Sequence, residues 1–194
     1  MRFLLLAVLA LSAALATVAV AAGAVSRTSA PRGERIEIGE DRRMRLVCEG
    51  PKTTLPVVWM EAGAFSGAAD FAALQAKLTA RGLRSCAYDR AGMGFSDTGP
   101  APRDGDAIVG DLEKLVAASG ERGPFVLVGH SMAGLYTRQF AVRNPDKVVG
   151  LVLVDAVTPD MIGQPGADRF VDRMTLVSRV GAVAGSIGLT KLLY

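Results

Sequence analysis

One stretch of the sequence constrains the fold more than any other. An apolar run over residues 125–128 leads into a Gly-x-Ser-x-Ala turn centred on Ser131, and a helical pattern follows at once. This arrangement is typical of a sharp turn from a buried strand into a helix, with the serine hydroxyl exposed above a parallel sheet. Because the turn is tight, the residues two before and two after the serine must be small, and these are Gly129 and Ala133. The stretch predicts a layered α/β fold that presents a serine for chemistry.

The rest of the chain alternates short apolar runs with helical patterns, as parallel sheets do. Mostly apolar segments typical of strands lie at residues 56–60, 83–88, 125–128 and 148–154. Helical spacing of apolar residues lies at 69–80, 106–119 and 132–143. Residues 32–40 and 43–48 predict an antiparallel hairpin, because they flank a glycine-containing turn. We therefore expect a mostly parallel sheet with helices on both faces.

The chain divides into three expected parts: an N-terminal targeting or anchoring segment at 1–30, an α/β core at 31–159 and a partial lid or cap segment at 160–194. In the third part, helical spacing continues through Phe170, Met174 and Val177, and the glycines from position 181 onward are expected to interrupt it. A lid that touches a membrane through these side chains is one interpretation. Ordinary core or cap packing is the other.

The first part consists almost entirely of apolar residues. Residues 3–22 carry no charge, and about 20 apolar residues can span a bilayer as a helix. Small-x-small sites at 19–21 and 22–24 also fit a cleaved signal peptide. Both interpretations remain open: a membrane-anchored protein with an exported domain, or a secreted or periplasmic one. The membrane is thus an expected partner.

Composition argues against several other classes of function. The net charge is only +3, and no Lys and Arg run of the kind that marks a nucleic-acid-binding patch occurs, so nucleic acid is not an expected partner. The glycines of Gly92-Met93-Gly94 do not begin a helical pattern, which argues against a dinucleotide site. Cys48 and Cys86 are the only cysteines and have no metal-binding spacing, so we expect no cofactor and no metal. A disulfide and two buried thiols both fit this pair.

Four motifs, each at the end of a predicted strand, resemble the α/β-hydrolase fold family of the esterase, lipase and peptidase-like kind. They are residues 61–64 (Glu-Ala-Gly-Ala), 88–96 (Tyr-Asp-Arg-Ala-Gly-Met-Gly-Phe-Ser), 129–134 (Gly-His-Ser-Met-Ala-Gly) and 151–155 (Leu-Val-Leu-Val-Asp). Their order and spacing are similar to those of the family, and the resemblance covers residues 32–159. It implies the N-terminal part of that fold, through the sixth strand.

The resemblance also implies roles for individual residues. Ser131 would be the nucleophile, attacking a small carboxylic ester or amide substrate to form an acyl-enzyme. The backbone N–H groups of Ala64 and Met132 would form the oxyanion hole. Asp89 and Arg90 would be structural, holding their loop through bonds from side chain to backbone.

In the family's sheet order, the second strand lies beside the fourth. Cys48 and Cys86 belong to these two predicted strands. A disulfide would require their Cα atoms to lie within about 7 Å. The resemblance strengthens this interpretation and leaves the two buried thiols as the alternative.

The sequence departs from the family in its catalytic triad, which runs serine, acid, histidine. Asp155 is the one family-consistent acid, and a structural carboxylate at a strand end is the alternative interpretation. The only histidine is His130, next to Ser131, where a packing role is expected because it cannot reach the serine as a base. We expect a C-terminally truncated serine hydrolase, inactive or incomplete as this chain. The alternative is a non-catalytic member of the fold that binds a partner.

Overall fold

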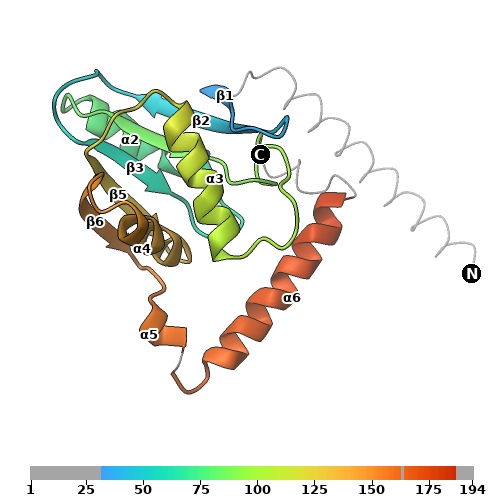
Figure 1. Cartoon of the computed structure of the whole chain (residues 1–194). Helices are drawn as coiled ribbons and strands as arrows, with labels where there is room; N and C mark the ends of the chain where they lie inside the picture. The colour runs from blue at the N-terminus through green and yellow to red at the C-terminus, as the bar shows by residue number, and fades with distance from the viewer. Residues whose placement is uncertain (1–31, 163, 187–194) are drawn as a thin grey trace, which may run out of the picture. The chain divides into compact units, whose positions relative to one another are not determined.

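The computed structural model describes residues 32–162 and 164–186 (Figure 1). The strands in this part of the chain are β1 (Glu34–Glu37), β2 (Arg43–Glu49), β3 (Val57–Glu61), β4 (Ser85–Tyr88), β5 (Phe125–His130) and β6 (Val148–Val154). The helices are the 3-10 turn η1 (Ala68–Phe71), α2 (Ala72–Thr79), α3 (Gly105–Ala118), α4 (Ala133–Arg143), α5 (Pro159–Ile162) and α6 (Ala167–Ser186). Strands and helices alternate along the chain as the hydrophobic pattern predicts.

The six strands form one sheet in the order β1-β2-β4-β3-β5-β6. β1 and β2 form the predicted antiparallel hairpin, and β2 also runs antiparallel to β4. The remaining neighbours are parallel. The predicted fold class, a mostly parallel sheet with helices on both faces, is confirmed.

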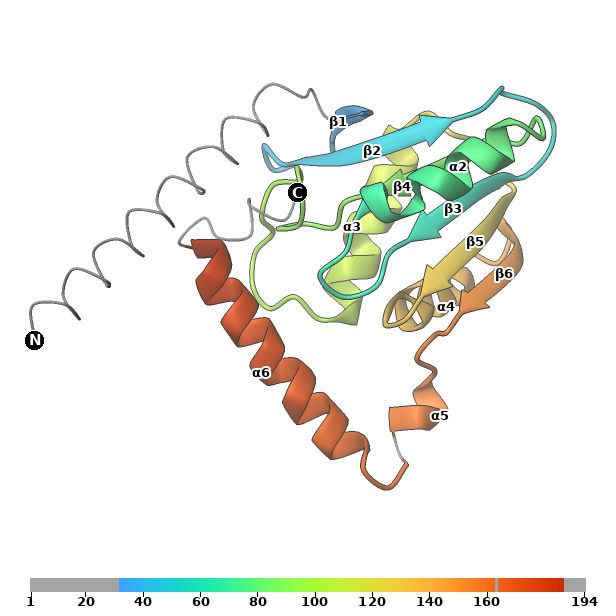
Figure 2. The ribbon, with the colours of Figure 1, turned by 180° about the vertical axis from the view of Figure 1, so that it is seen from behind.

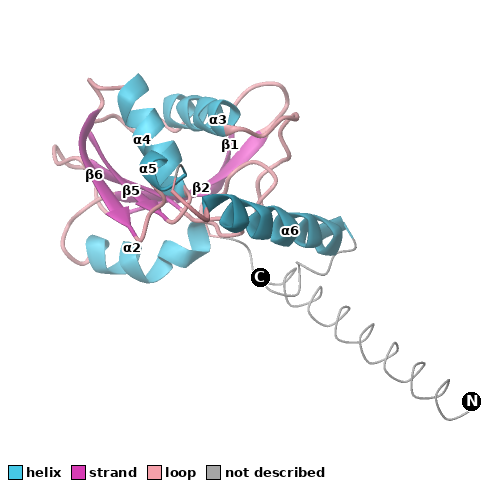
Figure 3. Ribbon diagram, turned by 90° about the horizontal axis from the view of Figure 1, so that it is seen from below, coloured by secondary structure: helices cyan, strands magenta, loops and turns pink. Residues whose placement is uncertain are grey.

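Helices cover the two faces of the sheet unequally. α3 and α4 lie on one face, and η1 with α2 lies on the other, as Figure 3 shows from below and Figures 1 and 2 show from opposite sides. The larger core includes Trp59, Phe125 and Leu127 from the sheet and packs against Leu112 of α3 and Phe140 of α4. A smaller core fills the opposite face. Its buried members are Val47, Met60, Ala68, Ala87 and Val128.

The apolar pattern of residues 69–80 predicts that Phe71, Leu74 and Leu78 face the core. Phe71 and Leu78 pack against the smaller core, but Leu74 is exposed and Gln75 is fully buried. Gln75 Nε2 donates hydrogen bonds to the backbone carbonyls of Val47 and Ser85 at 2.9 and 3.3 Å. A buried amide is tolerated where its donors are satisfied, so these carbonyls offset the burial of Gln75.

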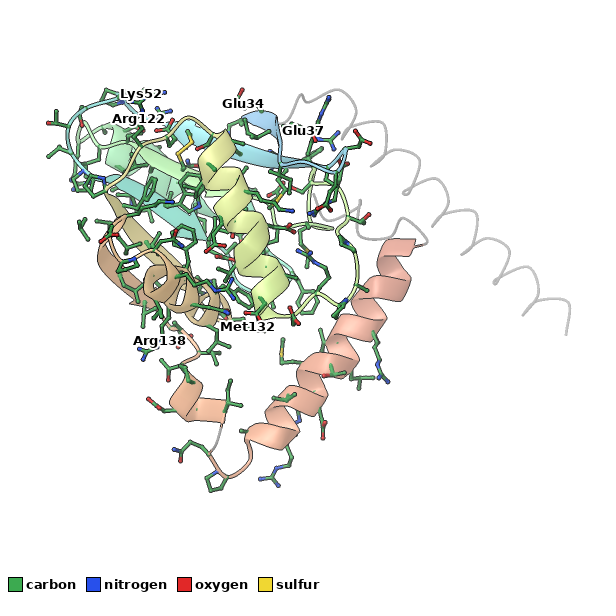
Figure 4. The ribbon with its side chains drawn as sticks, viewed as in Figure 1. Glu34, Glu37, Lys52, Arg122, Met132 and Arg138 are labelled. Carbon is green, nitrogen blue, oxygen red and sulfur yellow. A yellow bond between two sulfur atoms is a disulfide. The ribbon has the colours of Figure 1, made fainter. Side chains whose placement is uncertain are left out.

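Cys48 and Cys86 form a disulfide between the adjacent strands β2 and β4, with a Cα–Cα separation of 4.1 Å. The bond is drawn in yellow in Figure 4. It links residues 38 positions apart in the sequence. The two cysteines are directly opposite each other in the register of the antiparallel pair, and this pairing brings their sulfur atoms together.

The prediction that residues 148–154 form a buried strand is wrong in one respect. β6 has the predicted bounds, but Val149, Val152 and Leu153 are 61%, 47% and 43% exposed. β6 pairs with β5 on one side, and no other strand of the described residues pairs with its outer edge. Its apolar sequence, typical of an interior strand, therefore forms the edge of the described sheet.

Residues 32–163 form one compact unit, and α6 belongs to another. α6 continues through Gly181 and Gly185, where an interruption was expected, because glycine in a helix costs only about 1 kcal/mol. Of the predicted lid residues, Met174 is half-buried and Val177 is exposed, and the side chain of Phe170 lies outside the described residues. The lid and the domain boundaries stay predictions.

The expected anchor or signal segment, residues 1–30, lies outside the described residues. Within residues 32–162 and 164–186, the structure has no helix that is both long enough and apolar enough to cross a membrane.

Candidate active site

The parallel strands bring the sequence motifs to one edge of the sheet. Glu61 at the end of β3 is in register with Gly129 of β5, and Gly129 is in register with Leu153 of β6. The segments that follow β3, β4, β5 and β6 therefore all begin at the carboxyl edge, where α/β folds place their ligand sites. Figure 4 shows Met132 at this end, away from Lys52 and Arg122 at the opposite end.

Ser131 occupies the tip of the turn between β5 and α4 with a strained backbone. Its φ is +54°, a left-handed conformation that costs an L-residue about 1–2 kcal/mol. The Ser131 N–H donates to Val154 O at 3.1 Å, and its carbonyl accepts from Val157 N at 2.9 Å and Gly134 N at 3.1 Å. These three bonds tie both sides of the serine to neighbouring backbone and maintain the left-handed conformation.

The small residues around the serine are required by packing. A Cβ on Gly129 would lie 2.5 Å from Thr137 Oγ1 and 3.0 Å from Ala133 O. Ala133 is itself fully buried at the start of α4. The close approach of the first turn of α4 to the end of β5 explains why both positions carry small side chains.

The two predicted oxyanion-hole residues lie on either side of the serine. Met132 immediately precedes α4, whose start has no side-chain cap. Ala64 follows Gly63, and a Cβ on Gly63 would lie 3.1 Å from the Cβ of Ser131. Within residues 32–162 and 164–186, the backbone N–H groups of Ala64 and Met132 have no hydrogen-bond acceptor. Free N–H groups beside a serine can stabilise a developing oxyanion.

Asp89 fixes the loop that follows β4. Its buried carboxylate pairs with Arg45 Nη1 at 3.1 Å. It also accepts hydrogen bonds from the backbone N–H groups of Ala68 at 2.8 Å and Phe95 at 3.0 Å. Asp89 thus joins β2, η1 and its own loop, which is the structural role that the family resemblance implied.

Arg90 fixes the segment that carries Ala64. Its guanidinium donates to the backbone carbonyls of Ala62 and Gly63. Nη1 also lies 3.5 Å from Glu61 Oε1, and the central carbon of the guanidinium lies 5.9 Å from the centre of the Tyr136 ring. Arg90 therefore bonds the segment that follows β3 in addition to its position in the loop after β4.

Glu61 is the most perturbed acid near the site. Complete burial raises the pKa of Glu61 to about 7, against the opposing effects of the Arg90 charge and the Tyr88 hydroxyl. Burial, together with the nearby Glu61 carboxylate, in turn raises the pKa of Tyr88 well above its usual value. A buried acid that titrates near neutral pH is frequent in functional sites.

Two predicted residues remain: His130, for which a packing role was expected, and Asp155, the candidate acid. His130 lies beside Gly63, because a Cβ on Gly63 would be 3.0 Å from His130 Nδ1. Asp155 is exposed just after β6, with φ +44°. The structure brings Asp155 to the same sheet edge as Ser131 because its neighbour Val154 bonds the serine backbone.

Two features of the site were missed by the sequence analysis. Glu61 received no role, although a lone acid at the end of an apolar run was a usable signal. Phe65 has φ +61°, a conformation uncommon for a bulky residue, and no sequence signal indicated it. Both residues flank the segment 62–64.

One group of described residues has the composition of a metal site. Sγ atoms of Cys48 and Cys86 and a carboxylate oxygen of Glu121 lie within 4.8 Å of one another. Because the two sulfurs are joined in a disulfide, they offer no thiolate, which is the form that binds metal.

The segment that contains the sheet and the serine turn also matches a known protein family. Residues 56–174 match the family described as alpha/beta hydrolase fold. The match covers more than half of the chain, so the protein belongs to the α/β-hydrolase family.

Individual relatives share the same region. An uncharacterized protein of Schizosaccharomyces pombe is 33% identical over 115 residues, which are 56% of this chain and 21% of the relative. An AB hydrolase superfamily protein of Gibberella zeae is 31% identical over 128 residues, 62% of this chain and 39% of the relative. An esterase from Exiguobacterium antarcticum has a similar fold, with a TM-score of 0.59 and 21% identity over 66% of this chain and 46% of that chain. The chain thus spans less than half the length of each.

Proposed function

We propose that the protein is a serine hydrolase that cleaves a small carboxylic ester or amide through an acyl-enzyme on Ser131. The observation that carries the proposal is the conformation of Ser131, at φ +54° on the turn between β5 and α4. A strained backbone of this kind is typical of a turn that holds a serine hydroxyl exposed above the sheet. The free N–H groups of Ala64 and Met132 beside it support the same chemistry.

The reaction has two balanced steps. Ser131 Oγ attacks the substrate carbonyl carbon, and a base removes the hydroxyl proton. The negative charge on the carbonyl oxygen is stabilised by the N–H groups of Ala64 and Met132. The bond to the leaving alcohol or amine then breaks and the leaving group takes the proton. Water attacks the acyl-enzyme in the same way, releasing the acid and regenerating Ser131.

Proton transfer requires a base that the proposal does not assign within these residues. Asp155 is the acid that we assign to orient such a base, because Val154 and Val157 on either side of it bond the Ser131 backbone. His130, the only histidine of the 194 residues, packs beside Gly63 and is not assigned as the base.

A second candidate function follows from that histidine count. A protein with the fold and an oxyanion-type pocket of N–H groups, but without a base, would bind an acidic or carbonyl-containing partner and not turn it over. This non-catalytic function competes directly with hydrolysis, and one experiment separates the two.

The experiment is active-site labelling of the purified chain with a fluorophosphonate, with and without added imidazole as an external base. We expect a covalent adduct on Ser131, detected by mass spectrometry, whose rate rises about 10-fold or more with imidazole. Ser131→Ala is the control and should give no adduct. Labelling equal in wild type and Ser131→Ala, or no adduct on Ser131 even with imidazole, would contradict the proposal and favour the non-catalytic function.

A further inference from the structure

The segment before Ala64 is held by a buried charged pair that the reaction itself does not use. Glu61 is completely buried, and its carboxylate makes no hydrogen bond of ordinary geometry within the described residues. Its nearest cation is Arg90, with Nη1 at 3.5 Å. An uncompensated buried carboxylate is strongly unfavourable, so the position of Arg90 is coupled to that of Glu61.

Arg90 also holds residues 62–64, which we call the oxyanion loop. It donates hydrogen bonds to the carbonyls of Ala62 and Gly63. The carbonyl of Gly63 and the N–H of Ala64 belong to the same peptide unit, which is planar and trans. The bond from Arg90 to Gly63 O therefore fixes the direction of the Ala64 N–H, which points away from the guanidinium.

The opposite side of the loop meets the serine turn. A Cβ on Gly63 would lie 3.0 Å from His130 Nδ1 and 3.1 Å from the Cβ of Ser131. The loop is thus confined between Arg90 on one side and the residues of the turn on the other. A side chain at position 63 would therefore be in tight contact with His130 and Ser131, and one of them would have to shift by a few tenths of an ångström.

We propose that Glu61 is a positioning residue, which holds Arg90 so that its bonds to Ala62 and Gly63 aim the Ala64 N–H at the oxyanion. The consequence for catalysis rests on the proposed function of Ser131. The orientation of the Ala64 peptide unit does not, and it is measured separately.

The ionisation of Glu61 makes the arrangement sensitive to pH. Burial raises the pKa of Glu61 to about 7, so the pair with Arg90 is charged above this value and loses its attraction below it. The other groups that face the pair are Tyr88 from β4 and Tyr136 from α4, and burial raises the pKa of both. Asp111 of α3 acts on Tyr88, and His130 lies across the loop.

The first measurement is a pH titration of the Ala64 backbone amide by NMR, which needs no catalytic turnover. In the wild-type chain we expect its chemical shift to follow a transition near pH 7. The transition should persist in His130→Gln, which removes the imidazole that lies next to Gly63. It should vanish in Glu61→Gln, which keeps the shape of the side chain and loses its charge.

The second measurement is the rate of Ser131 acylation by the fluorophosphonate in the presence of imidazole. We expect Glu61→Gln to be about 10-fold slower and Arg90→Lys about 100-fold slower, since loss of one oxyanion donor costs roughly 100- to 1000-fold. Glu121→Gln is the matched control. It removes a carboxylate paired with Arg84 at 2.6 Å, just before β5 and away from the site, and should leave the rate unchanged.

The outcomes separate the two proposals. If wild type acylates but Glu61→Gln has the wild-type rate and an unchanged Ala64 titration, the positioning role is overturned. If wild type does not acylate even with imidazole, the proposed hydrolase function fails, and the Ala64 titration alone decides the role of Glu61. If Arg90→Lys does not fold, the wild-type and Glu61→Gln titrations still decide it.

Discussion

The segments on the two sides of Ser131 are built differently. On the side of β3 and β4, Glu61, Asp89 and Arg90 are 0%, 1% and 8% exposed and are linked by ion pairs and hydrogen bonds to several segments. On the side of β6, Val154 is 46% exposed and Asp155 is exposed. On that side, the segment is joined to the serine turn by backbone hydrogen bonds between Ser131 and both Val154 and Val157.

The difference separates two parts of the proposed chemistry. On the buried side, the proposed orientation of the Ala64 N–H group depends on buried charged side chains that bond to several segments. The exposed side carries the acid assigned to proton transfer, which is held by no ion pair within the described residues. Substitutions on the buried side should therefore affect stability much more than those on the exposed side.

The largest expected effect is that of Asp89→Ala. The substitution leaves buried Arg45 without its partner at 3.1 Å and leaves two backbone N–H groups without an acceptor. We expect the free energy of unfolding in urea to fall by about 3–5 kcal/mol. Asp155→Asn is the control, because Asn also tolerates the φ of +44° at this position, and we expect a change below about 0.5 kcal/mol. Equal costs for the two variants would remove the contrast between the two sides.

The next effect is a dependence of stability on pH that comes from Glu61. Folding raises the pKa of Glu61 from 4.5 to about 7, so the folded state binds the proton more tightly between these values and stability must fall as pH rises through this window. At about 1.4 kcal/mol per pKa unit, the loss between pH 4.5 and pH 8 is about 3 kcal/mol. Urea unfolding at pH 4.5 and pH 8 should show this loss in wild type relative to Glu61→Gln. Parallel pH profiles for the two proteins would refute it.

Gly129→Ala tests the packing of the serine turn. The new Cβ would lie 2.5 Å from Thr137 Oγ1 and 3.0 Å from Ala133 O, and such overpacking costs about 1–3 kcal/mol. Adding Thr137→Ala should recover part of the loss. Gly110→Ala in α3 is the matched control, because its Cβ would meet nothing within 4 Å, and it should be neutral or stabilising. A harmless Gly129→Ala would show that the turn has room to relax.

The smallest effect is a gain in stability from Ser131→Gly. Glycine adopts the observed φ of +54° without strain. Its unfolded state has more conformational entropy, which offsets part of this effect, so we expect a net gain in stability of about 0.5–1 kcal/mol. Ser131→Ala should give no gain. Asp155→Gly should gain less, since Asp tolerates its φ of +44° better than most residues. Thermal unfolding of the three variants measures this, and no gain in Ser131→Gly would mean that the turn is not strained.

Local sequence patterns predicted the elements well, because strands and helices bury residues at characteristic spacings. The strand at 148–154 and the helix ending before Asn144-Pro145 were predicted at or within a residue of their bounds. The serine turn was predictable for the same reason, since the small residues at 129 and 133 are adjacent in sequence to the strand and helix that require them.

Burial and partners were harder to predict, because they depend on segments distant in sequence. Gln75 is buried since carbonyls of Val47 and Ser85 receive its amide, and nothing near position 75 indicates them. The exposure of β6 depends on which strands lie beside it, and its apolar sequence suggested an interior strand.

The sequence by itself determined the order of the elements, the family and the turn that carries Ser131, because each is encoded in residues that are close together along the chain. Only the tertiary structure decided that Glu61, Arg90 and the carbonyl of Gly63 meet behind the oxyanion loop. They come from the ends of two neighbouring strands, and their interaction arises when the sheet aligns those ends and excludes water from the charges between them.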